Sequence, residues 1–125
     1  MIVDTSALIA ILRREPDAPE LTAKLTSGVP VRLSAGTLLE ARIVAWRDGE
    51  QTELHEFLDE IAAQVVPVDQ TQVDAAFEGF LRYGKGRNPA ALNLGDLFAY
   101  ALAKTRDESL LFKGNDFTRT DLRFA

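Results

Sequence analysis

Four carboxylates stand at positions where a charged side chain is costly. Asp4 ends the apolar run 1–3, Glu40 and Asp96 lie inside the apolar stretches 37–44 and 94–101, and Asp116 follows the apolar run 110–112. A carboxylate beside a core must be hydrogen-bonded, paired, protonated or bound to a cation. Four such residues from distant segments predict one acidic pocket, and an acidic pocket favours a divalent metal ion.

Converging carboxylates restrict the chemistry of such a pocket. Two carboxylates about 5 Å apart repel each other by roughly 3 kcal/mol at an effective dielectric constant of about 20, so four cannot all stay ionised without a cation. Mg²⁺ and Mn²⁺ are hard ions that prefer carboxylate and water oxygens. A metal-bound water can lose a proton and attack a phosphodiester. The sequence therefore predicts in-line hydrolysis by a metal-activated water.

Each of these carboxylates also has a purely structural interpretation. Asp4 can cap the helix that follows it, and Asp96 stands three residues after Asn93, which is the spacing of a capping box. Glu40 can pair with a neighbouring arginine, and Asp116 can be a turn residue. No single position is specific, so the metal-site prediction depends on all four together.

Composition excludes several other chemistries. The chain has 125 residues, of which 46% are hydrophobic and 26% charged, and this predicts one folded domain over residues 1–125. It has no cysteine, which excludes a disulfide scaffold, a thiolate zinc site and a cysteine nucleophile. The single histidine, His55, lies in a polar stretch and is expected to face solvent.

Charge and hydropathy predict where the protein works and what it meets. The formal net charge of −5 argues against non-specific binding of nucleic acid through a broad basic face, and it favours a basic protein partner. Nucleic acid remains possible as a substrate, because metal ions supply local positive charge. No apolar run approaches the roughly 20 residues of a membrane span, and the N-terminus lacks a signal-peptide pattern. We therefore expect a cytoplasmic protein without membrane association.

Short apolar runs alternate with helical periodicity along the chain. We predict that Thr5 or Ser6 caps the first helix and that Leu39, Ile43 and Trp46 form the apolar stripe of the helix over 36–47. Strands are predicted at 1–4, 31–34, 65–68 and 109–112, with a further short strand within 120–125, and helices at 6–14, 18–26, 36–47, 52–61, 69–81 and 94–106.

This alternation predicts an α/β fold with a short, mostly parallel central sheet and helices on both faces. In such folds ligands bind beyond the carboxyl ends of the strands. Asp4 and Asp116 lie just past two of those ends, and Glu40 and Asp96 would reach the same place from helices.

Three segments resemble those of a known family. Residues 1–8 (MIVDTSAL) resemble the start of PIN-domain proteins, residues 93–103 (NLGDLFAYALA) resemble their third acidic motif, and residues 110–117 (LLFKGNDF) resemble the closing motif of one subgroup. The likeness spans residues 1 to about 121. Within the PIN family the chain is most similar to VapC-type toxins, the ribonuclease half of VapBC toxin–antitoxin pairs.

The resemblance implies a Mg²⁺-dependent endoribonuclease, with Mn²⁺ as a substitute, that cleaves structured cellular RNA. It also implies a homodimer and a VapB-type antitoxin, which would form a heterotetramer or larger assembly and place a basic side chain against the carboxylates. Asp4 and Asp96 would be the principal metal ligands, with Glu40 bound directly or through water. The implied supporting residues are Thr5, Ser6, Asn93, Lys113 and Asn115.

One position departs from the family pattern. Many PIN proteins carry a fourth aspartate where this chain has Gly114, so Asp116 remains as the candidate for a second metal or for water. The departure leaves a catalytically silent PIN-like binding domain as an alternative. A receiver-like signalling module phosphorylated on Asp69, and a nuclease acting on DNA, also remain open. If the substrate is RNA, the residues expected to contact it are Tyr83, Lys85 and Arg87.

Overall fold

A computed structural model describes residues 1–86 and 88–125, and it contains one parallel sheet. Its strands are β1 (Ile2–Val3), β2 (Arg32–Ser34), β3 (Gln64–Val66) and β4 (Leu110–Leu111), in the spatial order β3-β2-β1-β4. Each pair of neighbours is parallel, and parallel neighbours require long crossover connections. The helices supply these connections, which confirms the α/β fold.

Six helices alternate with these strands in the described residues. They are α1 (Thr5–Leu12), α2 (Ala18–Leu25), α3 (Ala35–Arg47), α4 (Gln51–Glu60), α5 (Gln70–Tyr83) and α6 (Leu94–Arg106). All six were predicted from the sequence, with ends that differ by no more than two residues. None of the helices formed by residues 1–86 and 88–125 has both the length and the apolar character needed to cross a bilayer.

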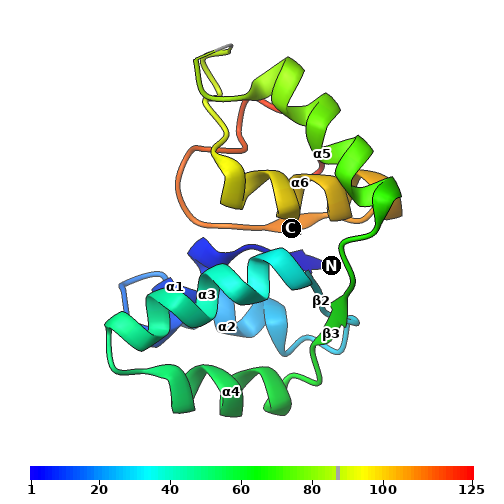
Figure 1. Cartoon of the computed structure of the whole chain (residues 1–125). Helices are drawn as coiled ribbons and strands as arrows, with labels where there is room; N and C mark the ends of the chain where they lie inside the picture. The colour runs from blue at the N-terminus through cyan, green and yellow to red at the C-terminus, as the bar shows by residue number, and fades with distance from the viewer. Residues whose placement is uncertain (87) are drawn as a thin grey trace.

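Helices cover both faces of the sheet because successive side chains of a strand point to opposite sides. Val3 and Leu111 belong to a core cluster with residues of α1, α2, α3 and α4, whereas Ile2 and Leu110 belong to a second cluster with residues of α6. Figure 1 shows the same division, with α5 and α6 on one side of the strands and the other four helices on the opposite side. The two clusters hold the ends of β1 and β4 in fixed register (Ile2 with Leu110, Val3 with Leu111).

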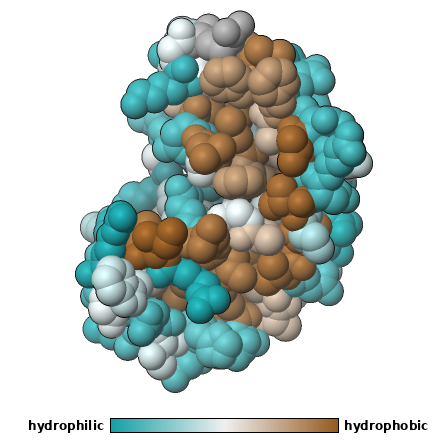
Figure 2. All heavy atoms as spheres, viewed as in Figure 1, coloured by the Kyte–Doolittle hydropathy of each residue, from teal (hydrophilic) through white to brown (hydrophobic). Residues whose placement is uncertain are grey.

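The apolar stripe of α3 differs from the sequence prediction. Leu39, Ile43 and Trp46 are 62%, 43% and 66% exposed, so the stripe faces away from the core of this chain. The buried face of α3 consists of Thr37, Ala41 and Ala45. Small side chains allow α3 to pack closely on α1 and α6, its two main helical neighbours. Figure 2 shows apolar side chains gathered over the face that carries α3 and α5 in Figure 1.

The C-terminal residues extend the sheet less than predicted. Instead of a strand within 120–125, a single parallel bridge joins Leu110 to Phe124. The Leu110 amide donates to the Arg123 carbonyl at 2.9 Å, and the Ala125 amide donates to the Leu110 carbonyl at 2.9 Å. These bonds cover the free edge of β4 and fix the end of the chain beside it.

Candidate metal centre

Asp4 lies at the junction of β1 and α1. Its backbone is extended (φ −91°, ψ 157°), as helix caps require, so Asp4 itself caps α1 rather than Thr5 or Ser6 as predicted. Asp4 Oδ2 accepts hydrogen bonds from the Ser6 amide at 3.0 Å and from the Ser6 hydroxyl at 2.7 Å. The other oxygen, Oδ1, is buried and has no hydrogen-bond partner. One half of the carboxylate therefore fixes its orientation while the other half is left for a ligand.

Asp96 is held in a similar way at the start of α6. Asn93 Oδ1 accepts from the Asp96 amide at 2.9 Å, and Asp96 Oδ2 accepts from the Asn93 amide at 3.0 Å, which completes a capping box. The structural and functional interpretations of Asp4 and Asp96 are thus compatible, because each carboxylate uses one oxygen as a cap.

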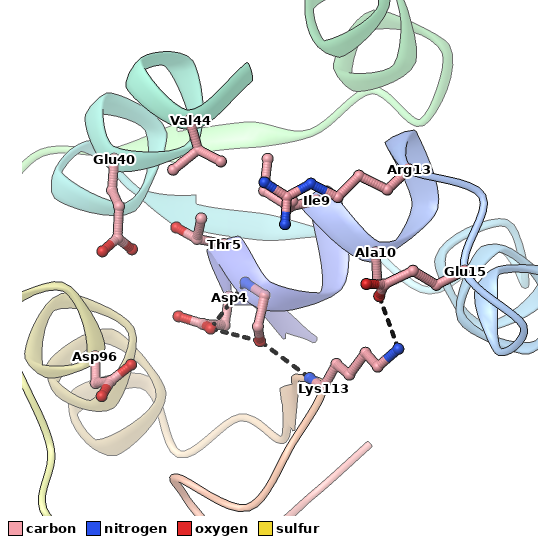
Figure 3. Close-up of a pocket in the computed structure, with 11 residues that line it drawn as sticks. Asp4, Thr5, Ile9, Ala10, Arg13, Glu15, Glu40, Val44, Asp96 and Lys113 are labelled. Atoms are coloured by element: carbon pink, nitrogen blue, oxygen red, sulfur yellow. Dashed lines mark hydrogen bonds and ion pairs between the residues drawn. The ribbon is translucent and has the colours of Figure 1, made fainter. Parts of the chain in front are cut away.

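The two aspartates line one pocket with Glu40. This pocket has a volume of about 350 Å³, and its walls include Asp4, Glu40, Asp96 and Lys113. Figure 3 shows Glu40 projecting from α3 and Asp96 from α6 toward Asp4 at the end of β1. Thr5 links α1 to α3 beside this pocket, since its hydroxyl donates to the Thr37 carbonyl at 3.3 Å. The pocket opens at the carboxyl end of β1, where ligands bind in parallel sheets.

Burial raises the pKa of both aspartates. It is the main cause that brings the pKa of Asp4 to about 6, with a further contribution from the negative charge of Glu40. Burial also dominates for Asp96, whose pKa is raised to about 7, and the charges of Asp4, Asp116 and Glu40 add to it. The pocket therefore resists carrying its full negative charge unless a cation enters.

The acids alone do not enclose a metal. Among residues 1–86 and 88–125, no three His, Cys, Asp or Glu side chains form a group that could hold a metal ion by themselves. Mg²⁺ usually keeps several waters and binds through one or two carboxylates, so a complete protein cage is not required. The unpartnered Asp4 Oδ1, together with hard oxygen donors on Asp96 and Glu40, fits such an ion.

Asp116 and Asn115 do not line this pocket. Both are exposed in the turn after β4, which begins with Gly114 at φ +98°. Asp116 is still near enough for its charge to raise the pKa of Asp96. The structure thus leaves the fourth predicted acid at the margin of the site.

Lys113, one of the implied supporting residues, directs its side chain toward the turn after α1. Its ammonium forms ion pairs with Glu15, which lines the same pocket, at 2.7 Å and with Asp17 at 3.1 Å, and its backbone amide donates to Ser6 Oγ at 3.0 Å. Sequence reasoning missed Glu15, which flanks Pro16 and reads as a solvated turn residue. Arg13, which pairs with Asp48 at 2.7 Å, also lines the pocket and was missed.

Of the described residues expected to contact RNA, one is partly buried and the other is exposed. The Tyr83 ring packs against Tyr100, with ring centroids 5.8 Å apart, so it contributes to the packing of α5 on α6. Lys85 is exposed. Arg87 lies outside the described residues.

Comparison with known proteins decides the family. The model of the PIN domain matches residues 1–122. The chain belongs to the PIN domain family. It is 48% identical to a protein named Ribonuclease VapC from Mycolicibacterium smegmatis over 98% of this chain and 97% of that protein. It is 43% identical to Ribonuclease VapC30 of Mycobacterium tuberculosis over 98% and 95% of the two chains. Membership excludes the receiver-like interpretation.

Solved PIN-domain structures share the fold. VapBC2 from Rickettsia felis, crystallised with a DNA fragment from its promoter, superposes with a TM-score of 0.75 at 13% identity over 99% of this chain and 96% of that one. VapC20 of Mycobacterium tuberculosis, described as a toxin that cleaves the sarcin–ricin loop, superposes with a TM-score of 0.75 at 15% identity over 99% and 97%. The PIN fold of this chain, with helices on both faces of a parallel sheet, is therefore established independently of sequence motifs.

Proposed function

We infer that the chain is a VapC-type endoribonuclease, the toxin of a toxin–antitoxin pair, and that residues 1–125 form its single nuclease domain. The observation that carries the active-site assignment is the buried, unpartnered Oδ1 of Asp4 in a pocket shared with Asp96 and Glu40. The ribonuclease names of relatives more than 40% identical over nearly the whole chain support the activity.

We propose Mg²⁺ as the cofactor, with Mn²⁺ as a substitute. Asp4 and Asp96 would hold the ion, with Glu40 binding directly or through water. The bound ion would offset phosphate charge and lower the pKa of a water.

The protein's own groups prepare the two aspartates for this role. Ser6 holds Asp4 Oδ2, and the Asn93 amide holds Asp96 Oδ2, so both carboxylates are oriented before any ligand arrives. Thr5 fixes the first turn of α1 to α3. Because a pKa of about 7 leaves Asp96 partly protonated near neutrality, cation binding is expected to release protons. We keep Asp116 as the candidate for a second ion or a water, with Asn115 beside it.

The proposed substrate is structured RNA and the proposed inhibitor a VapB-type antitoxin. Structural neighbours of this fold include a toxin–antitoxin complex from Klebsiella pneumoniae and the sarcin–ricin-loop toxin. A basic antitoxin side chain would occupy the acidic pocket and compete with the metal, and the net charge of −5 favours such a partner. We also propose a cytoplasmic location and a homodimer that forms a heterotetramer or larger complex with the antitoxin.

Replacing Asp4 by asparagine tests this function. Asp4→Asn keeps the size and the cap but removes the charge, so Mg²⁺-dependent cleavage of ribosomal RNA should fall by roughly 100-fold or more, as expected for a lost metal ligand. The matched control is Asp74→Asn, which removes an exposed carboxylate on α5. Sequencing of RNA ends with and without Mg²⁺ measures both. Cleavage by Asp4→Asn at the rate of the parent would refute the site.

A further inference from the structure

Two glycines lie where α3 and α6 approach each other next to the acidic pocket. Gly36 is in the first turn of α3, and Gly95 is in the first turn of α6. The two helices pack against each other. Neither glycine has a positive φ, so the backbone conformation alone does not require glycine at either position.

Gly95 leaves room for the carboxylate of Glu40. A Cβ atom built on Gly95 would lie 2.5 Å from the Glu40 carboxyl carbon and 2.7 Å from Oε1, and closer still to Oε2. Such distances are far inside van der Waals contact. The Glu40 side chain therefore lies directly on the backbone of α6, one residue before Asp96, and any side chain at position 95 would displace it.

Gly36 leaves a matching space for Phe98. A Cβ atom on Gly36 would lie 2.5 and 2.6 Å from the two Cδ atoms of the Phe98 ring. Thus a side chain from each helix packs onto a glycine of the other: Phe98 of α6 on Gly36, and Glu40 of α3 on Gly95. The reciprocal contact fixes how α3 lies on α6, and with it the separation of Glu40 from Asp96.

We propose that Gly95 is a positioning residue of the active site, which admits the Glu40 carboxylate beside Asp96 and Asp4, with the Gly36–Phe98 contact holding the two helices at the required distance. This rests on the proposed metal-dependent nuclease function. Figure 3 shows the consequence, since the Glu40 carboxylate reaches over the pocket toward Asp4 and Asp96. The charge of Glu40 accordingly raises the pKa of both aspartates.

Gly95→Ala separates positioning from folding. Alanine is a better helix former than glycine, so the thermal midpoint of the metal-free protein should stay equal or rise. Glu40 should nevertheless turn away from Asp96, which a crystal structure of the metal-free variant would show. Mn²⁺ affinity by titration calorimetry and RNA cleavage should each fall on the order of 10-fold. The matched control is Leu94→Ala, which shortens an exposed side chain in the same helical turn and should leave the thermal midpoint, the position of Glu40, the Mn²⁺ affinity and RNA cleavage unchanged.

Double variants test whether the effect acts through Glu40. In the Glu40→Ala background, Gly95→Ala should cause no further loss of Mn²⁺ affinity. Glu40→Asp, which withdraws the carboxylate by one methylene, should cost less in the Gly95→Ala background than in the parent. Additive losses would overturn the proposal, because they would mean that alanine distorts α6 itself.

Different results would refute the proposed nuclease function and the positioning role of Gly95. If the parent protein cleaves no RNA with Mg²⁺ or Mn²⁺, the proposed function fails, while the position of Glu40 in the metal-free variant still tests the role of Gly95. If the parent cleaves RNA and Gly95→Ala binds Mn²⁺ equally well, only the role of Gly95 is refuted. A variant that does not fold would also refute it, because rotation of one flexible side chain should relieve the clash.

Discussion

Asp4 caps α1 and Asp96 completes the capping box of α6, and both are also prospective metal ligands. Burying these two acids costs stability. The ordinary pKa of an aspartate in the unfolded chain is 3.8, whereas burial raises the pKa of Asp4 to about 6 and that of Asp96 to about 7. At pH values between the pKa of the unfolded chain (3.8) and the raised pKa values of the folded chain, the folded state therefore binds more protons than the unfolded state. The metal-free protein should therefore lose stability as the pH rises from about 4 to about 7.

The size of this loss can be measured by denaturant unfolding in EDTA across that pH range. A shift of about two units corresponds to on the order of 3 kcal/mol for Asp4. In Asp4→Asn and Asp96→Asn the loss should shrink, and each variant should be more stable than the parent at pH 7.5 without metal. Added Mg²⁺ should stabilise the parent more than either variant. Stability that rises between pH 4 and 7 would contradict the buried-acid description.

The sequence predicts that Asp4, Glu40 and Asp96 share a pocket, and it predicts less about the contacts around them. Asp4, Glu40 and Asp96 were selected because apolar neighbours predicted burial, and a carboxylate in such surroundings is a local signal. The direction of the Lys113 side chain is not local, since it depends on where the turn after α1 carries Glu15 and Asp17. The sequence around position 95 likewise does not predict the need for glycine there, because the side chain that requires the space, Glu40, comes from α3.

At the element scale, Asp121 joins α5, α6 and the C-terminal residues. Its carboxylate accepts from the Tyr100 hydroxyl at 3.0 Å and pairs with Lys104 at 2.6 Å and Arg82 at 3.4 Å. Partial burial raises the pKa of Asp121, but the hydrogen bonds from Lys104 and Tyr100 and the charges of Lys104 and Arg82 hold it below its usual value. The Tyr100 side chain is almost fully buried, so loss of its acceptor leaves a hydroxyl without a partner.

Asp121→Ala should therefore lower the free energy of unfolding by about 1–3 kcal/mol, mostly through Tyr100. Tyr100→Phe removes the donor as well as the need for an acceptor and serves as the comparison. In the Tyr100→Phe background, Asp121→Ala should cost clearly less, because only partly exposed ion pairs remain. Urea unfolding of the four proteins measures this coupling. If Asp121→Ala lowers the free energy of unfolding equally with tyrosine and with phenylalanine at position 100, the loss does not act through the Tyr100 hydroxyl.

Element types were predictable from the sequence because each strand contains or adjoins short apolar stretches and each helix has a recognisable start and stop. Besides the strand expected within 120–125, the prediction that failed was the direction in which one helix faces. The apolar stripe of α3 was assigned to the core by its periodicity, yet Ala41 and Ala45 form the packed face and the large residues face outward. Periodicity shows that a helix has an apolar face, and it does not show whether that face is covered by the same chain or by another.

At the scale of the whole molecule, the outward apolar residues of α3 and α5 are the largest anomaly. Leu39, Ile43 and Trp46 on α3, and Val73, Phe77 and Leu81 on α5, are each 43–66% exposed. An apolar surface of this extent, gathered on one face in Figure 2, is typical of an interface. A twofold homodimer would cover the surface of both copies with one contact, which agrees with the proposed assembly.

Trp46→Glu tests this assembly. The indole is 66% exposed in the single chain, so the substitution should change the stability of a monomer by about 0.5 kcal/mol or less. In a dimer the same change buries a charge in an apolar contact, and dissociation should follow. Light scattering after size-exclusion chromatography should give a dimer for the parent and a folded monomer for Trp46→Glu. Glu53→Gln, which removes an exposed carboxylate of α4, should remain dimeric. A monomeric parent, or a dimer that Trp46→Glu leaves intact, would show that another surface or no surface joins the copies.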